Sequence, residues 1–299
     1  MTNMKTLTNA MSVDVEDYFQ VQAFASVIDR GTWDTIPSRV EANTGRMLDQ
    51  FAAAGIHATF FTLGWVAERH PAIVRRIVDA GHELASHGYG HELVHTLTPE
   101  QFQADLLRAK DVLENAGGVS VIGYRAPTFS IGPRNPWAFD VLEQTGHRYS
   151  SSVYPVRHDL YGVPDAPRFP YRPGPGALVE IPMTTVRLAG RNLPISGGGY
   201  FRLMPYLLFR TLLRRFQSHD ARPSVFYVHP WEIDPTQPRI RAASRRARFR
   251  HTVNLSATAG RIDRLLNDFN WDRMDRVFAS HFAPNLAPDL APDLARLSA

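Results

Sequence analysis

The sequence predicts an α/β fold in which helices cover a parallel sheet, and three observations lead to this prediction. Short apolar, strand-like runs alternate with stretches of helical spacing along most of the chain. The alternating unit is about 30 residues long, which suits a βα barrel. No shift in composition divides the 299 residues, so we expect a single domain.

The first half of the chain supplies most of this alternation. The segment 10–17 (AMSVDVED) alternates apolar with polar residues, as a half-buried strand does. Helices are expected to end at Gly55 and Gly81, and the helix after Thr98 has Pro99 at its first position. The predicted strands are 10–17, 56–64, 82–86, 120–127 and 147–155, and the predicted helices are 40–54, 65–80, 99–116 and 135–145.

The second half is less regular, because residues 155–200 are rich in Pro and Gly. We expect extra strands or an insertion there, and βα units again after it. The elements predicted here are strands at 179–186, 193–201 and 223–230, helices at 205–216 and 256–271, and a basic segment at 239–251. The domain is expected to cover residues 10–282, between an N-terminal tail (1–9) and a Pro-rich C-terminal tail (283–299).

The composition excludes several classes of site and partner. There is no Cys, so any metal must be held by His and carboxylates. The 33 Lys and Arg exceed the 29 Asp and Glu, but no dense basic run is interleaved with aromatic residues, and we expect no nucleic-acid partner. No apolar run reaches the roughly 18 residues of a transmembrane helix. Because residues 1–13 do not read as a signal peptide, a cytoplasmic protein is expected, or one peripheral at the inner membrane.

Carboxylates occupy the polar face of the first predicted strand. Alternate side chains of a strand share a face, so Asp14 and Glu16 point the same way. Asp17 falls on the apolar side unless the strand has already ended. Surface acids on a solvated edge strand would give the same pattern.

Three later segments place His or Arg at predicted strand ends. His87 and His91 are four residues apart, but the two glycines between them disfavour the helix of an HExxH motif, and we expect a loop. Arg125 ends a strand before Ala-Pro, where it can clamp a carboxylate. His229 ends the apolar strand at 223–230. Taken singly, each residue also fits an ordinary surface or core position.

Together these residues predict a metal-dependent active site. One carboxylate and two His make a three-ligand site with open positions, which suits Zn²⁺ or a similar divalent ion. A free carboxylate, Asp14, can take a proton from a bound water, and a third His, His229, can donate a proton to a leaving group. The carboxyl ends of barrel strands are where such folds hold catalytic groups.

Five motifs in order resemble the polysaccharide deacetylase family, whose members carry the NodB homology domain (carbohydrate esterase family 4). The motifs are SVDVEDYF, GHELASHGYGHE, GYRAPTFSIG, GGGYFRLMP and FYVHPWEIDPTQPR. They are most similar to a subgroup found with bacterial exopolysaccharide and exosortase loci. The resemblance covers about residues 10–280. It implies a distorted (β/α)7-type barrel that removes N-acetyl groups from amino sugars of a bacterial exopolysaccharide or its precursor.

The resemblance also implies roles for single residues. The general base, the residue that orients it and the general acid would be Asp14, Arg125 and His229. The metal ligands would be Glu16, His87 and His91, with Zn²⁺ as the first choice and Co²⁺, Ni²⁺ or Fe²⁺ as alternatives. The sugar groove would be lined by Pro127, Trp231 and Tyr200.

Two positions depart from the common family pattern. The acidic pair here is one residue further apart than the usual adjacent Asp pair, so Asp17 stays an alternative to Glu16 as the metal carboxylate. Many members use an Asp to tune the acid His, whereas this chain has Ser in the corresponding YSSSVYP segment. Asp159 or Asp165 could take that role, and the sequence does not choose between them.

Two other functions remain open on the same residues. Relatives with this acidic pattern include hydrolases of small cyclic amides, which would use the same site on another substrate. A non-catalytic sugar-binding component is the second alternative, although candidate groups at all six metal and catalytic positions disfavour it. The expected partner is an amino-sugar polymer or oligosaccharide, and the oligomeric state is left open.

Overall fold

A computed structural model describes residues 7–282 of the chain. The predicted C-terminal tail and most of the N-terminal tail therefore lie outside the described residues. The first strand begins at Thr8, two residues before the predicted start of the domain. No helix within residues 7–282 is long and apolar enough to cross a bilayer.

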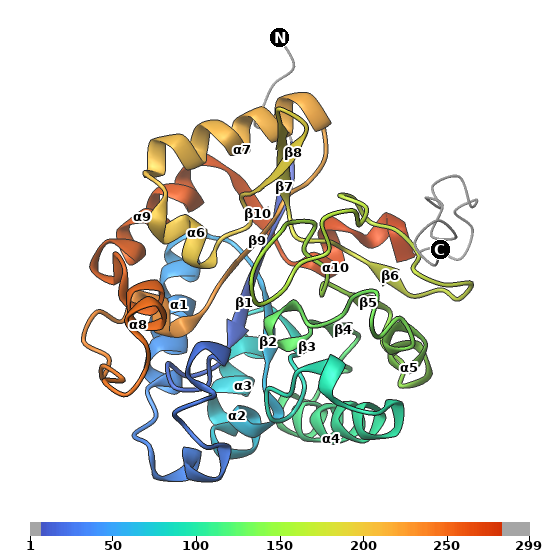
Figure 1. The fold of residues 1–299 in the computed structure, drawn as a ribbon, viewed down its shortest axis with the longest axis vertical. Coiled ribbons are helices and arrows are strands. Elements are labelled where there is room, and N and C mark those ends of the chain that lie inside the picture. The colour runs from blue at the N-terminus through green and yellow to red at the C-terminus, as the bar shows by residue number, and fades with distance from the viewer. Residues whose placement is uncertain (1–6, 283–299) are drawn as a thin grey trace.

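A curved parallel sheet forms the centre of the fold (Figure 1), which confirms the predicted α/β class. Seven strands follow one another in the order β10-β1-β2-β3-β4-β5-β6, and β9 also pairs with β1. Within residues 7–282 no pairing joins β6 to β9, so the barrel is open on that side. The strands are β1 Thr8–Val15, β2 Thr59–Thr62, β3 Glu83–Ser86, β4 Gly123–Tyr124, β5 Tyr149–Ser150, β6 Val179–Glu180, β9 Val225–Val228 and β10 Asn270–Asp272.

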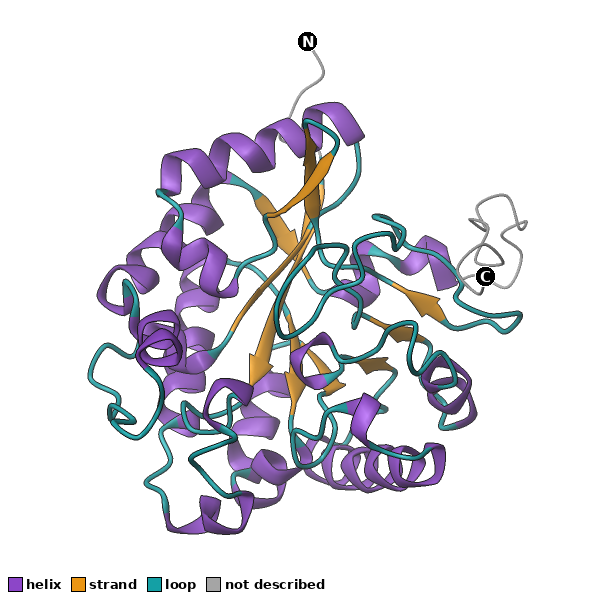
Figure 2. Cartoon of the chain, in the orientation of Figure 1, coloured by secondary structure: helices purple, strands orange, loops and turns teal. Residues whose placement is uncertain are grey.

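Helices flank the sheet on its outer side (Figure 2). Apolar side chains of β1 and β2 pack with those of α1, α3, α7 and α9 in the largest core cluster. The helices are α1 Val40–Ala54, α2 Gly64–Arg69, α3 Pro71–Asp79, α4 Pro99–Gly117, α5 Ala138–Gln144, α6 Gly198–Leu203, α7 Tyr206–Asp220, α8 Arg245–Thr252, α9 Leu255–Asp268 and α10 Met274–Val277. The capping box at Thr98 and the left-handed Gly55 confirm two predicted helix boundaries.

Four predicted elements are wrong in detail. The strand expected over 179–186 divides into β6 and β7 (Thr185–Leu188), and the helix expected over 256–271 ends at Asp268, where β10 follows. The helix expected over 65–80 divides into α2 and α3, because Pro71 begins a new helix after His70. The strand expected over 193–201 is also wrong beyond its start. Its first residues belong to β8 (Arg191–Pro194), which forms a hairpin with β7 (Thr185–Leu188), but α6 follows at Gly198.

A close approach of two backbones explains why the strand stops there. Gly197 has φ of 123°, and a Cβ at this position would lie 2.0 Å from the carbonyl oxygen of Tyr227. Only glycine permits this contact with β9, and the chain turns into α6 directly afterwards. The turn brings α6 beside the carboxyl end of β9.

Candidate metal centre and active site

The polar residues singled out in the sequence meet at one edge of the sheet. Asp14 lies in β1 and Glu16 follows its last residue, while His87, Arg125 and His229 directly follow β3, β4 and β9. Because parallel strands end at the same edge, these side chains converge although they are far apart in the sequence.

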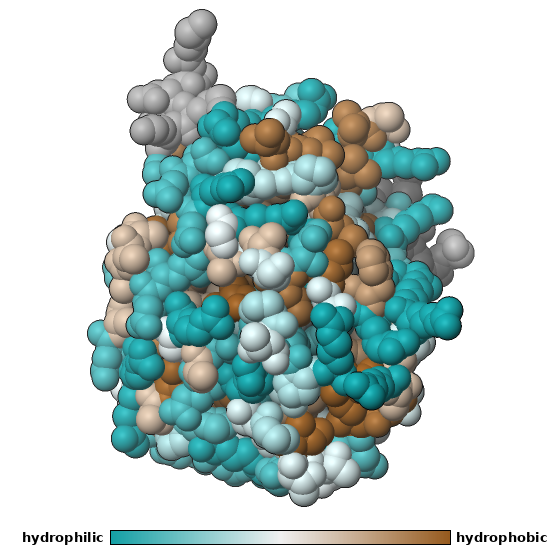
Figure 3. Space-filling model, turned by 90° about the vertical axis from the view of Figure 1, so that its left-hand side faces the viewer, coloured by the Kyte–Doolittle hydropathy of each residue, from teal (hydrophilic) through white to brown (hydrophobic). Residues whose placement is uncertain are grey.

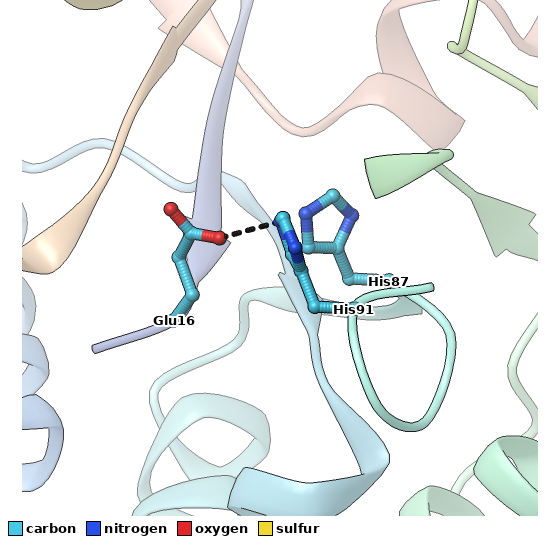
Figure 4. Close-up of side chains that lie close together, drawn as sticks. All are labelled: Glu16, His87 and His91. Atoms are coloured by element: carbon cyan, nitrogen blue, oxygen red, sulfur yellow. Dashed lines mark ion pairs between the residues drawn. The ribbon is translucent and has the colours of Figure 1, made fainter. Parts of the chain in front are cut away.

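Glu16, His87 and His91 form a buried cluster whose candidate ligand atoms all lie within 4.8 Å of one another. Figure 4 shows the carboxylate pointing from the end of β1 toward two imidazoles on the loop after β3. Gly88 (φ 75°) and His91 (φ 55°) both adopt left-handed backbone conformations, which turn this loop back on itself. The turn carries His91 alongside His87, as the predicted loop requires.

The protonation states of this cluster fit a divalent metal. His87 Nδ1 donates to the carbonyl oxygen of Arg125 at 2.7 Å, which leaves Nε2 with its lone pair free. Burial is the main cause that lowers the pKa of His87 to about 4, so the ring is neutral. Burial alone would raise the pKa of Glu16, but His91, His229 and His87 together lower it to about 2.

One oxygen of Glu16 shows most directly that the cluster suits a cation. Oε2 lies 2.8 Å from Nε2 of His91, within ion-pair distance, yet it accepts no hydrogen bond of ordinary geometry. A buried carboxylate oxygen without a hydrogen bond is costly unless a positive charge satisfies it. An ion held jointly by this oxygen and the two imidazoles would satisfy it.

Asp17 lies outside the cluster. Its carboxylate accepts hydrogen bonds from the Ser38 hydroxyl and from the backbone N–H groups of Tyr18, Arg39 and Val40. It therefore holds the start of α1. The chain leaves the strand at Val15, so the alternation that would place Asp17 on the apolar side no longer applies. Of the two alternatives left by the sequence, the structure places Glu16 with the histidines.

Asp14 is fixed by a fully buried arginine. Arg125 Nη1 lies 2.6 Å from Asp14 Oδ1 and also donates to the Ser12 hydroxyl at 2.8 Å. The remaining guanidinium groups donate to the Ser151 carbonyl and hydroxyl oxygens at 3.1 Å. These contacts fix the guanidinium group, which binds Oδ1 of Asp14. The other carboxylate oxygen, Oδ2, faces Nε2 of His229 at 4.0 Å.

His229 is held by a residue that the sequence reasoning missed. Glu232 Oε1 accepts from His229 Nδ1 at 2.7 Å and from its backbone N–H at 3.0 Å. Its other oxygen accepts from Nε of Arg202, which is itself buried and donates to backbone carbonyls at the end of α8. The sequence HPWE contained a signal for this contact. A 3₁₀ turn directly after His229 brings the side chain of Glu232, three residues later, back to the imidazole ring.

The two acids proposed from the sequence as partners of His229 are therefore wrong. Asp159 pairs with Arg246, Arg250 and His158. Asp165 lines a separate groove beside the β7–β8 hairpin. Burial would lower the pKa of His229, but Glu16, Glu232 and Asp14 raise it to about 9. In the metal-free site the ring is thus protonated at neutral pH, with Nε2 turned toward Glu16 at 3.6 Å.

A cavity of about 280 Å³ opens over these groups. Tyr200 and Trp231 line it, as do Asp14, Glu16 and His229, whereas Pro127 does not, although its neighbours Ala126 and Thr128 do. Trp231 stacks on His229 and on His251, and its N–H donates to Glu16 Oε1 at 3.2 Å. The indole is thus engaged mainly with the protein's own side chains.

Comparison with known proteins divides the chain into two matched segments. Residues 31–150 match the polysaccharide deacetylase family, and residues 151–279 match a family described as a domain of unknown function, DUF3473. His87, His91 and Arg125 belong to the first segment, and His229 belongs to the second. Asp14 and Glu16 precede both.

Curated relatives are similar over part of their length. The peptidoglycan deacetylase of Helicobacter pylori is 34% identical over 118 residues, which make up 38% of this chain and 38% of that protein. The chitooligosaccharide deacetylase of Sinorhizobium fredii is 31% identical over 157 residues, 52% of this chain and 66% of that protein. The chain spans only 30% to 38% of the length of the first three curated relatives.

Two solved structures share the fold over nearly the whole chain. A Mycobacterium smegmatis protein assigned as a polysaccharide deacetylase has a TM-score of 0.60 at 21% identity, covering 98% of this chain and 97% of its own. Puue allantoinase has a TM-score of 0.59 at 17% identity, covering 95% and 94%. At such identities the similarity shows the fold alone.

Proposed function

We propose that this chain, which belongs to the polysaccharide deacetylase family and carries a DUF3473 extension, is a metal-dependent hydrolase that removes N-acetyl groups from amino sugars of a bacterial exopolysaccharide or its precursor. The observation that carries the proposal is the buried Glu16–His87–His91 cluster with Asp14 and His229 beside it in one cavity. This arrangement contains a cation site, a proton acceptor and a proton donor.

Glu16, His87 and His91 would hold the metal. Zn²⁺ is the first choice, because two neutral imidazoles and one carboxylate leave open positions of the kind that catalytic zinc sites keep. When bound, a divalent ion supplies a Lewis acid for the acetamide carbonyl and lowers the pKa of water.

Asp14 would accept the proton of the attacking water. The Arg125 guanidinium and the Ser12 hydroxyl stand on one side of the carboxylate, and the cavity lies on the other. The buried ion pair with Arg125 fixes the direction of this carboxylate. Oδ2 is then the oxygen that receives the proton.

His229 would give a proton to the departing amine. Glu232 holds Nδ1–H, which leaves the Nε2–H of the protonated ring pointing into the cavity. Water adds its oxygen to the acetyl carbon, the C–N bond breaks, and the nitrogen leaves as a neutral amine with the proton from Nε2. The products are acetate and the free amino sugar.

The size of the cavity and the named relatives support a sugar substrate. A volume of about 280 Å³ suits a single acetamido sugar, with neighbouring sugars of a polymer outside it. Relatives are named for activity on peptidoglycan and chitooligosaccharides. Half-buried Tyr200 lies on the cavity wall, where an aromatic ring can contact the apolar face of a sugar.

The test is acetate release from N-acetylglucosamine oligomers by protein purified without chelator, together with its metal content. We expect metal-dependent release that His87→Ala abolishes along with bound metal. His95→Ala removes a histidine of the same loop that lies outside the cluster, and it should keep both. Release from a small cyclic amide but from no sugar oligomer would favour the second hydrolase function. Absence of both activity and metal binding would refute the proposal.

A further inference from the structure

The basic segment singled out in the sequence has no part in the chemistry proposed above. Residues 239–250 contain six arginines and no acidic residue. The second half of the segment forms α8, whose last turn reaches the cavity through Arg250 and His251. A strongly positive surface therefore borders the mouth of the proposed active site.

Most of this charge is uncompensated. Arg246 and Arg250 share a single carboxylate, that of Asp159. Arg239, Arg241 and Arg245 are exposed and form no ion pair with any residue between 7 and 282. Exposed arginines can be balanced by solution ions, but a cluster of them without acids creates a lasting positive potential.

Large apolar side chains are exposed at the same place. Phe249 lies between two arginines of α8 and is 58% exposed. Leu160 and Leu203 are each 47% exposed and both line the cavity together with Arg250. The two hydrogen bonds from Arg250 to Asp159 tie α8 to the loop that carries Leu160. Leu160, Leu203 and Arg250 thus lie at one opening, and Phe249 is next to Arg250 on α8.

This mixture distinguishes between two kinds of anionic partner. A soluble polyanion would use the arginines but gain little from Phe249 or the leucines. An anionic bilayer uses both, because arginines bind the headgroups while aromatic and aliphatic side chains enter the acyl boundary. Figure 3, which faces the side that carries α8, shows apolar residues interspersed among hydrophilic ones over this face.

We propose that α8 and the adjoining cavity mouth dock on an anionic lipid bilayer, so that the catalytic cavity opens toward the membrane surface. This inference goes beyond the deacetylase function, since the docking can be measured on protein without substrate. It gives a physical role to arginines that make no contact with the proposed catalytic groups.

The test is co-sedimentation of the full chain with vesicles of phosphatidylglycerol and phosphatidylcholine at low and high salt. We expect binding to phosphatidylglycerol vesicles that high salt weakens, and little binding to pure phosphatidylcholine. The double variant Arg241→Gln/Arg245→Gln should bind about 30-fold more weakly, because each arginine near an anionic surface contributes roughly a factor of five. Phe249→Ser should weaken binding by about tenfold.

Matched controls keep the result specific. Arg75→Gln/Arg191→Gln removes the same charge from α3 and β8, and Leu107→Ser removes an exposed apolar residue from α4. Both should bind vesicles like the unchanged protein, and all variants should keep its thermal unfolding midpoint. Equal binding to both lipids, or equal losses in the controls, would overturn the proposal. The proposal would also be overturned if the protein bound soluble polygalacturonate tightly and Phe249→Ser left vesicle binding unchanged. The surface would then be a site for soluble polyanions.

Discussion

Replacing Glu232 with Gln should remove the main support of the proposed acid, His229. The carboxylate accepts from Nδ1 at 2.7 Å and from the backbone N–H at 3.0 Å, and it forms a buried ion pair with Arg202. Gln keeps the size but not the charge, and its NH₂ group competes for the place of the acceptor. The variant thereby loses both the orientation of the ring and part of the stabilisation of its charged form.

The magnitude follows from two effects. A general acid contributes about 10²–10⁴-fold to the rate, so loss of its orientation should lower kcat by about 10². The Glu232 charge helps raise the pKa of His229 to about 9, and its removal lowers that pKa. Since the acid must be protonated, the alkaline limb of the pH–rate profile should move to lower pH. A cation bound to Glu16 would offset the charge of that carboxylate, so the pKa of His229 would then depend mainly on Glu232, at 2.7 Å.

The assay is the pH dependence of kcat/KM for acetate release, with metal content measured on the same samples. Leaving Arg202 without its partner is expected to cost about 3 kcal/mol, so thermal unfolding must show that the variant is folded. Asp159→Asn removes the acid that the sequence suggested and should leave the alkaline limb in place. The role of Glu232 would be refuted if the alkaline limb of the pH–rate profile stayed in place in Glu232→Gln but disappeared in His229→Gln.

Three further outcomes are expected. Arg125→Lys should lower kcat by about 10²-fold with metal content unchanged, because an ammonium group cannot hold Asp14, Ser12 and Ser151 together as the planar fork does. Gly197→Ala should lower the free energy of unfolding by about 3 kcal/mol in a denaturant titration, since its Cβ would meet the Tyr227 carbonyl, whereas Gly199→Ala has open space and should cost under about 1 kcal/mol. In metal-free protein the raised pKa of His229 contributes stability that is fully present below about pH 6.5 and is lost as the pH rises through about 9. Urea unfolding should therefore show that the free energy of unfolding decreases by about 3 kcal/mol across this pH range. The variant His229→Gln should not show this decrease.

The order of strands and helices from β1 to β5 could be predicted because it depends on periodicity and on strong local signals. The capped start of α4 and the glycine that ends α1 are fixed by residues close in sequence. The convergence of Asp14, His87 and Arg125 was predictable as well, since parallel strands share one carboxyl edge. In these cases local sequence and global fold agree.

The errors arise where one segment meets another that is distant in sequence. The start of α6 depends on how closely Gly197 approaches Tyr227, which no local pattern reveals. Glu232 lies only three residues from His229, but the arginine that fixes its other oxygen, Arg202, lies 30 residues away, and no local pattern reveals that contact. The choice of Glu16 over Asp17 required knowing that the strand ends at Val15 and that α1 needs a carboxylate at its start.

The proposed site divides its groups among three stretches of chain that the family boundaries separate. Asp14 and Glu16 come from β1 and the residue after it, before residue 31. His87, His91 and Arg125 come from 31–150, and His229 comes with Glu232 and Arg202 from 151–279. A gene split at residue 150 would yield a fragment with metal ligands but no proton donor. If the proposed function holds, the segment that matches DUF3473 supplies half of the catalytic groups, and exchange of that segment between relatives should fail unless the residues facing β1 are exchanged with it.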